Sequence, residues 1–279
     1  MTREGVLISG ASTGIGAATA SLLARNGFVT FAGYRNPEDE ATVAALGEGV
    51  RPISLDVTVE SSIDDARRTV RESGVRLTGI VSNAGVAIGG PLEHLPLQLL
   101  RRQFEVNVFG SLALVQALLP LLAEGSGRIV LVGSISGRLA TPYIGAYSAS
   151  KFALRAMADV LRVELAPGGV SVSLIEPGSV KTPIWRKGRE AAGEMASRLG
   201  ETVRPQYRVA FERMLTIAQR EERDGMSAGV VASAILHALT AAKPRANYLL
   251  GTGARMVGIL ALLPAALRDR ALRKSMRIP

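Results

Sequence analysis

Tyr147 and Lys151 have the spacing of a pair that could move a proton. Four residues apart in a predicted helix, their side chains share one helix face. A phenol has a pKa of about 10 in water, too high for an efficient base near neutrality, and a neighbouring ammonium group lowers that pKa. The pair could take a proton from an alcohol or give one to a developing alkoxide. The same spacing also occurs in ordinary surface pairs.

Ser134 and Asn107 are polar residues next to or within apolar runs. Ser134 follows the apolar run 128–132, thirteen residues before Tyr147. A strand end and the following helix can bring the serine hydroxyl and the phenol to one oxygen, where the serine would polarise a carbonyl or an alcohol. Asn107 lies in the apolar helical run 104–122, where an amide must find partners. The alternatives are a polar strand cap for Ser134 and an amide bonded only to nearby backbone for Asn107.

The elements that must position these residues alternate in type. Continuous apolar strands separated by helical stretches predict a mostly parallel sheet with helices on both faces. We expect one α/β domain over residues 1–279, a doubly wound Rossmann-type sheet whose ligands bind beyond the carboxyl ends of the strands. The seven predicted strands are 6–8, 28–32, 51–55, 77–81, 128–132, 170–175 and 248–250.

A glycine-rich turn joins the first predicted strand to a helix over 15–26. Gly10, Gly14 and Gly16 let the backbone approach a pyrophosphate, and the helix N-terminus adds free N–H groups and a positive dipole end. The spacing is G-x-x-x-G-x-G rather than G-x-G-x-x-G. A tight strand-to-helix connection without a ligand would explain the glycines alone, but the position of the turn favours a nucleotide site.

In their order along residues 6–182, these motifs resemble those of the short-chain dehydrogenase/reductase family. Residues 9–16 are similar to its cofactor loop, with serine where threonine is usual, and residues 82–85 differ from its Asn-Asn-Ala-Gly only at the first position. Tyr147 and Lys151 match its Tyr-x-x-x-Lys motif. The resemblance implies a nicotinamide-dependent oxidoreductase acting on hydroxyl or carbonyl groups, similar to the hydroxysteroid and retinol dehydrogenase-like branch.

The resemblance also implies a role for each matched residue. In the catalytic tetrad Tyr147 exchanges the proton, Lys151 also binds the nicotinamide ribose, and Asn107 holds a water that links Lys151 to solvent. Ser134 completes the tetrad. Asp56 and Val57 correspond to a pair that contacts adenine, and residues 177–182 to a segment that holds the nicotinamide. The implied cofactor-binding residues are Gly10, Ser12, Thr13, Gly14, Ile15, Gly16, Arg35, Asp56, Val57, Asn83, Ala84, Gly85, Tyr147, Lys151, Pro177, Gly178, Val180 and Thr182.

The end of the second predicted strand bears on the choice between NAD and NADP. Sheets that prefer NAD carry an acidic residue there, which binds the ribose 2′-hydroxyl. The corresponding residue is Tyr34, and Arg35 follows it. A guanidinium can bind a 2′-phosphate through charge-assisted hydrogen bonds. We therefore expect NADP rather than NAD; an ordinary solvated arginine is the alternative.

Residues 183–225 interrupt the alternation and indicate a helical insertion over the carboxyl edge of the sheet. In the resembling family this region forms the substrate lid. An apolar lid favours an apolar small-molecule substrate of steroid, retinoid or lipid type, and simple packing on the domain is the alternative. The apolar residues are Ile184, Trp185, Met195, Leu199, Tyr207, Phe211, Met214 and Leu215.

The predicted helical segment 253–279 combines an apolar stripe with basic residues. It could lie on an anionic membrane surface, or it could cap the domain or a partner subunit with the basic side chains solvated. The family resemblance suggests a homodimer or homotetramer built on the helices that carry Asn107 and Tyr147. The basic residues are Arg268, Arg270, Arg273, Lys274 and Arg277.

The composition argues against several classes of function. Without cysteine there is no disulfide or thiolate nucleophile, and the two histidines, His94 and His237, lie far apart, so we expect no metal site. The net charge of +9 comes without a basic run interleaved with aromatics, so nucleic-acid binding lacks a motif. The early first strand leaves no room for a signal peptide, and we expect a cytoplasmic protein.

Two interpretations compete with the NADP-dependent oxidoreductase. One is an NAD-dependent enzyme for another small alcohol or ketone, and the other is a cofactor-binding regulator without turnover.

Overall fold

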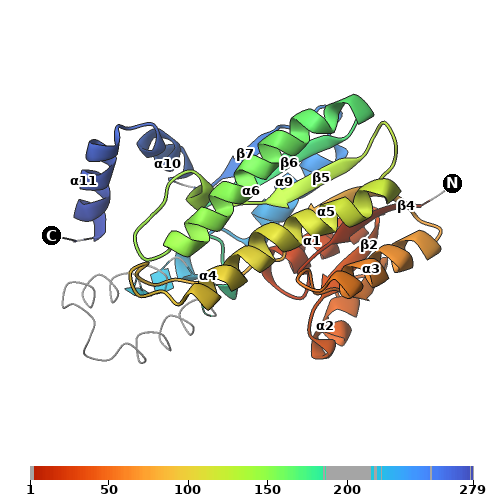
Figure 1. The fold of residues 1–279 in the computed structure, drawn as a ribbon. Coiled ribbons are helices and arrows are strands. Elements are labelled where there is room, and N and C mark those ends of the chain that lie inside the picture. The colour runs from red at the N-terminus through yellow and green to blue at the C-terminus, as the bar shows by residue number, and fades with distance from the viewer. Residues whose placement is uncertain are drawn as a thin grey trace.

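A seven-stranded parallel sheet forms the centre of the protein in this computed structural model. The structure describes residues 3–184, 186, 215–216, 219–220, 222–251, 253–276 and 278. The strand order is β3-β2-β1-β4-β5-β6-β7, and every neighbouring pair is parallel (Figure 1). The order reverses direction between β1 and β4, which is where sheets of this type bind ligands. The predicted parallel sheet is confirmed. The strands are β1 Glu4–Ile8, β2 Val29–Tyr34, β3 Val50–Ser54, β4 Arg76–Ser82, β5 Arg128–Val132, β6 Ser171–Pro177 and β7 Asn247–Leu250.

Helices cover both faces of the sheet, which explains why its central strands are apolar without interruption. Successive side chains of a strand point to opposite faces. In β5, Ile129 and Leu131 pack on the α3, α5 and α6 side, whereas Val130 packs on the α1 and α9 side. The described helices are α1 Gly14–Arg25, α2 Glu40–Ala44, α3 Glu60–Glu72, α4 Leu97–Phe104, α5 Gly110–Leu118, α6 Gly145–Glu164, α9 Ala228–Thr240, α10 Ala254–Ala261 and α11 Ala265–Met276.

The apolar run 104–122 is not one regular helix. A π-helical turn, Glu105–Phe109, separates α4 from α5, and a 3₁₀ turn, Leu119–Leu121, follows. The whole stretch Leu97–Leu121 is long and apolar enough to cross a membrane by length and composition. Its inward side chains, among them Leu114 and Leu118, are fully buried in the core against the sheet.

Most of the predicted lid lies outside the described residues. This holds for Trp185, Met195, Leu199, Tyr207, Phe211 and Met214, whereas Ile184 and Leu215 are described. The apolar lid therefore stays a prediction.

Candidate active site

The turn after β1 is packed so closely that side chains would not fit at its glycines. Gly14 has a φ of +59°, and a Cβ there would lie 2.9 Å from Cγ2 of Thr182. A Cβ on Gly16 would lie 2.1 Å from the carbonyl oxygen of Gly10. The turn thus meets the segment after β6, which sequence reasoning placed in the same site.

The ends of β1 and β4 are joined by buried polar groups. The hydroxyl of Ser9 accepts hydrogen bonds from the backbone N–H groups of Asn83 and Ala84, both at 3.0 Å. Nδ2 of Asn83 donates to the carbonyl oxygens of Ser9 and Gly10 at 3.0 and 2.9 Å. Sequence reasoning gave Ser9 no structural role, yet it is fully buried and fixes the loop at the point where the strand order reverses.

The start of α1 leaves donors available for a phosphate. Thr13 is the N-cap residue of α1, and its side chain makes no capping hydrogen bond. The first N–H groups of a helix need an acceptor from outside the helix. With the close approach at Gly14 and Gly16, this cradle fits the pyrophosphate of a dinucleotide, which Ser12, Thr13 and Ile15 would contact.

Three of the four candidate catalytic residues meet between β5 and α6. Ser134 follows β5 and caps the 3₁₀ turn Ile135–Gly137, its Oγ accepting from the N–H of Ser136 at 3.1 Å. Tyr147 and Lys151 lie on the first two turns of α6, and the tyrosine is hydrogen-bonded to Ser134. Nζ of Lys151 lies 5.7 Å from the centre of the Tyr147 ring.

Asn107 is the fourth candidate, and its amide is engaged by the protein itself. Its Oδ1 accepts from the N–H of Val86 at 2.9 Å, and its Nδ2 donates to the carbonyl of Val86 and to the hydroxyl of Ser150. The π-helical turn places it, and such turns are frequent at functional sites. A Cβ on Gly85 would lie 3.3 Å from Oδ1 of Asn107 and 3.9 Å from Nζ of Lys151. The absence of a side chain at Gly85 therefore leaves room for both polar groups beside the backbone.

Burial sets the pKa values of the central pair. Loss of hydration lowers the pKa of the buried Lys151 to about 8, and its Nζ donates to the carbonyl oxygen of Val132 at 2.8 Å. Burial also raises the pKa of Tyr147, opposed by its hydrogen bond with Ser134. In this structure the lysine donates to the carbonyl oxygen of Val132, and burial raises the pKa of Tyr147 instead of the lowering that the spacing predicted.

A buried carboxylate beside the site escaped sequence reasoning. Glu176, on β6, is fully buried and is bound by Nε of Arg138 at 2.8 Å and by Nη1 of Arg155 at 2.8 Å. Arg138 follows Ser134 by four residues, and Arg155 lies one helical turn after Lys151. The cluster thus ties the serine loop, α6 and the end of β6 together. The available signal was a charged residue inside an apolar strand, which must be paired when buried.

The segment after β6 is held by backbone contacts. Pro177 ends the strand, the N–H of Gly178 donates to the carbonyl of Leu250 at 2.8 Å, and the buried Val180 forms an isolated bridge with Met226. These contacts aim the chain at Thr182 and the glycine turn. Pro177, Gly178 and Thr182 thus lie along the edge where sequence reasoning placed the nicotinamide.

The candidate adenosine side lies beyond β2 and β3. Arg35 is exposed, and its Nε donates to the Asn36 side chain at 3.3 Å. Tyr34 points inward, and burial raises its pKa, as does its contact with Glu40. Asp56 uses Oδ1 to accept from the N–H and hydroxyl of Thr58 at 2.9 and 2.7 Å, so it shapes its own turn.

Residues 4–193 match the family model described as short chain dehydrogenase. The chain belongs to the short-chain dehydrogenase family. The family predicted from the motifs is thus confirmed, and the chain is a nicotinamide-dependent dehydrogenase or reductase acting on CH–OH or carbonyl groups.

Several members of this short-chain dehydrogenase family are similar over most of the chain. A 3-amino-tetrahydro-pyrrolizinone reductase of Xenorhabdus hominickii is 37% identical over 78% of this chain and 76% of its own. An NADPH-dependent 3-dehydrocapnine reductase of Ornithobacterium rhinotracheale is 32% identical over 97% of this chain and 96% of its own. A Burkholderia phymatum short chain dehydrogenase/reductase, solved in complex with NAD, has a TM-score of 0.77 at 26% identity, covering 100% of this chain and 96% of that one. Family members thus use either dinucleotide.

Proposed function

We propose that the chain is an NADP(H)-dependent oxidoreductase that interconverts a hydroxyl and a carbonyl on an apolar small molecule. The meeting of Tyr147, Ser134 and Lys151 beside the α1 cradle carries the proposal. When bound, the nicotinamide supplies or accepts the hydride. A regulator without turnover would not require a serine hydroxyl and a tyrosine phenol that both reach the substrate oxygen.

The proposed chemistry assigns one task to each side chain. Tyr147 exchanges a proton with the substrate oxygen, and the Ser134 hydroxyl, bonded to the phenol, stabilises charge on that oxygen. Lys151, with a pKa of about 8, changes protonation close to neutral pH and so can pass a proton on from the site. Asn107 positions α6 through Ser150. In the same proposal, a water held by Asn107 links Lys151 to solvent.

The decisive experiment is a substrate screen that follows NADPH absorbance with Tyr147→Phe beside the wild type. Loss of the proton donor lowers turnover about 10²- to 10⁴-fold. Tyr248→Phe is the matched control, because the Tyr248 hydroxyl is hydrogen-bonded to His237 of α9 and not to Ser134. Undiminished turnover by Tyr147→Phe refutes the mechanism.

The preference for NADP rests on Arg35. Its exposed guanidinium follows β2, where no acidic side chain is present at position 34. Arg35→Ser should raise KM for NADPH at least tenfold, since a charge-assisted bond contributes about 1.5–3 kcal/mol, and leave KM for NADH unchanged. Arg25→Ser, at the far end of α1, is the control. A wild-type KM lower for NADH than for NADPH would favour the NAD-dependent alternative.

An apolar substrate is supported by the surroundings of Tyr147. The first turn of α6 packs Ala146 against Ile88 and Leu95 in a small apolar cluster. Leu92 lies beside Gly145 at the helix start and is largely exposed. The buried cluster backs the helix start with apolar side chains, and the exposed Leu92 would meet a hydrocarbon substrate near the phenol. Activity on hydrophobic ketones in the screen, absent with small polar ones, is the expected result.

We also propose a homodimer or homotetramer built on α4, α5 and α6. α4, the π-helical turn and α5 form one run that lies alongside α6 (Figure 1). This run and α6 expose apolar side chains to solvent, namely Leu97, Phe109, Phe152, Val160 and Val163. Exposed apolar patches of this kind mark contacts between proteins. Light scattering of the purified protein should give a mass of two or four chains. A cytoplasmic location remains a prediction.

A further inference from the structure

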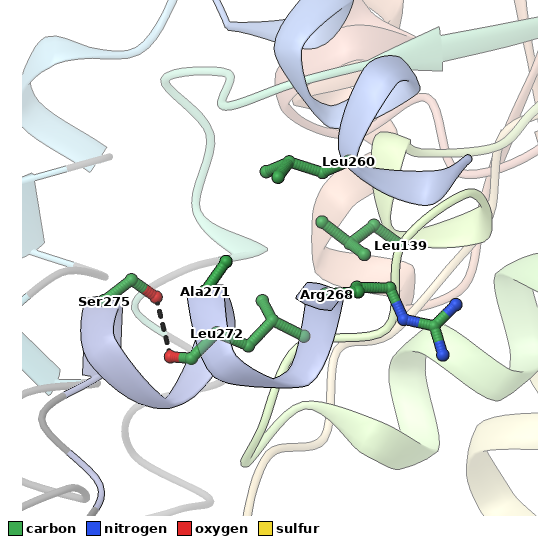
Figure 2. A pocket seen from close by; sticks show the side chains of 6 residues that line it. All are labelled: Leu139, Leu260, Arg268, Ala271, Leu272 and Ser275. Atoms are coloured by element: carbon green, nitrogen blue, oxygen red, sulfur yellow. Dashed lines mark hydrogen bonds between the residues drawn. The ribbon is translucent and has the colours of Figure 1, made fainter. Parts of the chain in front are cut away.

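The helices α10 and α11 lie at the opposite end of the molecule from the N-terminus (Figure 1). Their inner face packs on the loop between Ser134 and Tyr147. Leu260 of α10 and Leu272 of α11 line a small cavity with Leu139, which follows Ser134 (Figure 2). Further along α11, Met276 packs on the buried Tyr143. The inner face therefore caps the loop between Ser134 and Tyr147.

The outer face of α10 is apolar, and no described residue covers it. Met256, Ile259 and Leu262 are three residues apart, so they form one stripe along the helix. Their exposed fractions are 61%, 65% and 86%, well above those of the core. Leu267, at the start of α11, is also exposed. A row of exposed aliphatic side chains is a feature of surfaces that contact a partner or a membrane.

The outer face of α11 carries positive charge directly after this stripe. Arg270, Arg273 and Lys274 are all exposed. Asp269 is the one acidic residue in the described segment 253–276, and it lies beside Arg268, 3.7 Å from its Nε. Arg277 lies outside the described residues. The partner of this surface must therefore accept aliphatic side chains and several cations together.

These two requirements separate the candidate partners. A second copy carries the same +9 charge, and a two-fold contact would place the cationic helix against itself. The phosphates of a nucleic acid would bind the cations, but its bases stack on aromatic side chains and not on aliphatic ones. An anionic bilayer surface satisfies both, because acyl chains accept the stripe and lipid headgroups attract the cations.

We propose that the outer face of α10 and α11 binds an anionic lipid surface, with Met256, Ile259 and Leu262 inserted at the headgroup boundary and Arg270, Arg273 and Lys274 on the headgroups. The loop that carries Ser134 packs on the inner face of the same helices, so bound enzyme holds its active site beside the bilayer. Binding to vesicles needs neither substrate nor cofactor, so this proposal can fail or stand independently of the proposed function.

Flotation of the full chain with vesicles tests the proposal. Vesicles of phosphatidylcholine with phosphatidylglycerol should carry the wild type at 0.1 M salt, and vesicles of pure phosphatidylcholine should not. Neutralising two cations in Arg270→Gln/Lys274→Gln should lower the partition coefficient roughly thirtyfold. Ile259→Ser/Leu262→Ser should abolish flotation even though all cations remain.

Two control variants separate this surface from the general charge and apolarity of the protein. Arg71→Gln/Lys243→Gln removes the same charge from exposed positions elsewhere, and Val59→Ser/Val230→Ser removes exposed apolar groups elsewhere. Both should float like the wild type. The proposal is overturned if the wild type does not float, if both vesicle types carry it equally, or if Arg71→Gln/Lys243→Gln loses as much binding as the α11 variant. A change of oligomer mass in Ile259→Ser/Leu262→Ser without any vesicle binding would make a second copy the occupant.

Discussion

Two charged side chains are buried at the carboxyl edge of the sheet, and their surroundings are opposite. Glu176 is bound by two guanidinium groups, from Arg138 and Arg155. Lys151 donates to a carbonyl oxygen, and no carboxylate of the described residues forms an ion pair with it. A paired charge is fixed and holds elements together, whereas a buried charge without a counter-ion is easily lost. We infer that Glu176 has a structural role, holding the elements of the site together, and that Lys151 takes part in proton transfer.

The largest effect is expected from Lys151→Met, which keeps the length of the side chain but removes its charge. Turnover should fall roughly a thousandfold, because proton transfer contributes about 10²- to 10⁴-fold. Steady-state kinetics at pH 7 measure this, with unfolding by urea as the check on folding. Activity within tenfold of the wild type would show that the missing counter-ion has no bearing on function.

Glu176→Gln should act mainly on stability. It leaves Arg138 and Arg155 facing a neutral amide, and breaking a buried ion pair costs about 3 kcal/mol. The arginines are partly exposed, which favours a value at or below this figure. Urea unfolding measures the loss. Arg155→Met in the same chain should recover part of it, and a single variant as stable as the wild type would break the comparison.

The lysine should make stability depend on pH. Its pKa is about 8 in the folded protein and near 10.5 in the unfolded chain, so between these values the unfolded chain binds more protons. The free energy of unfolding should therefore rise from pH 8 towards 10.5, by about 1 kcal/mol per pH unit at most. The difference between wild type and Lys151→Met isolates this contribution. Parallel pH profiles for the two proteins would contradict the lowered pKa.

The smallest effect is expected at an exposed pair. Arg67 and Asp64 lie 3.0 Å apart on α3, with both side chains well exposed. Arg67→Gln should change the free energy of unfolding by about 0.5 kcal/mol or less, since solvent screens such pairs. Urea unfolding under the conditions used for Glu176→Gln gives the direct contrast. A loss as large as that of Glu176→Gln would show that burial is not what separates the two regions.

Local patterns were sufficient to predict the sheet and the meeting of the motifs. Strands buried on both faces are rich in apolar residues, and the run 129–132 of β5 was recognisable for that reason. Ser134 follows β5, and Tyr147 lies in the first turn of the next long helix, α6. The connection between the two residues is therefore short. Topology alone places such residues at one edge of a parallel sheet.

Contacts between distant segments were not predictable in the same way. Glu176 is 38 residues from Arg138 and 21 from Arg155, and no sequence pattern at such separations specifies an ion pair. The pKa of Tyr147 was expected to fall, but the loss of hydration depends on packing that spacing does not describe. The π-helical turn at Asn107 departs from the helix by one backbone hydrogen-bond step, too small a change for an apolar pattern to show.

Tyr143 has a consequence for the order in which the protein is completed during synthesis. Its φ of +68° is strained for a residue with a side chain, and Met276 and Ile278 pack against its ring. Met276 leaves the ribosome 133 residues after Tyr143, which corresponds to roughly ten seconds of translation. The sheet and both central carboxyl-edge charges are already present by then. The loop between Ser134 and Tyr147 therefore gains its packing contacts with the C-terminal helix only after the rest of the site has been synthesised.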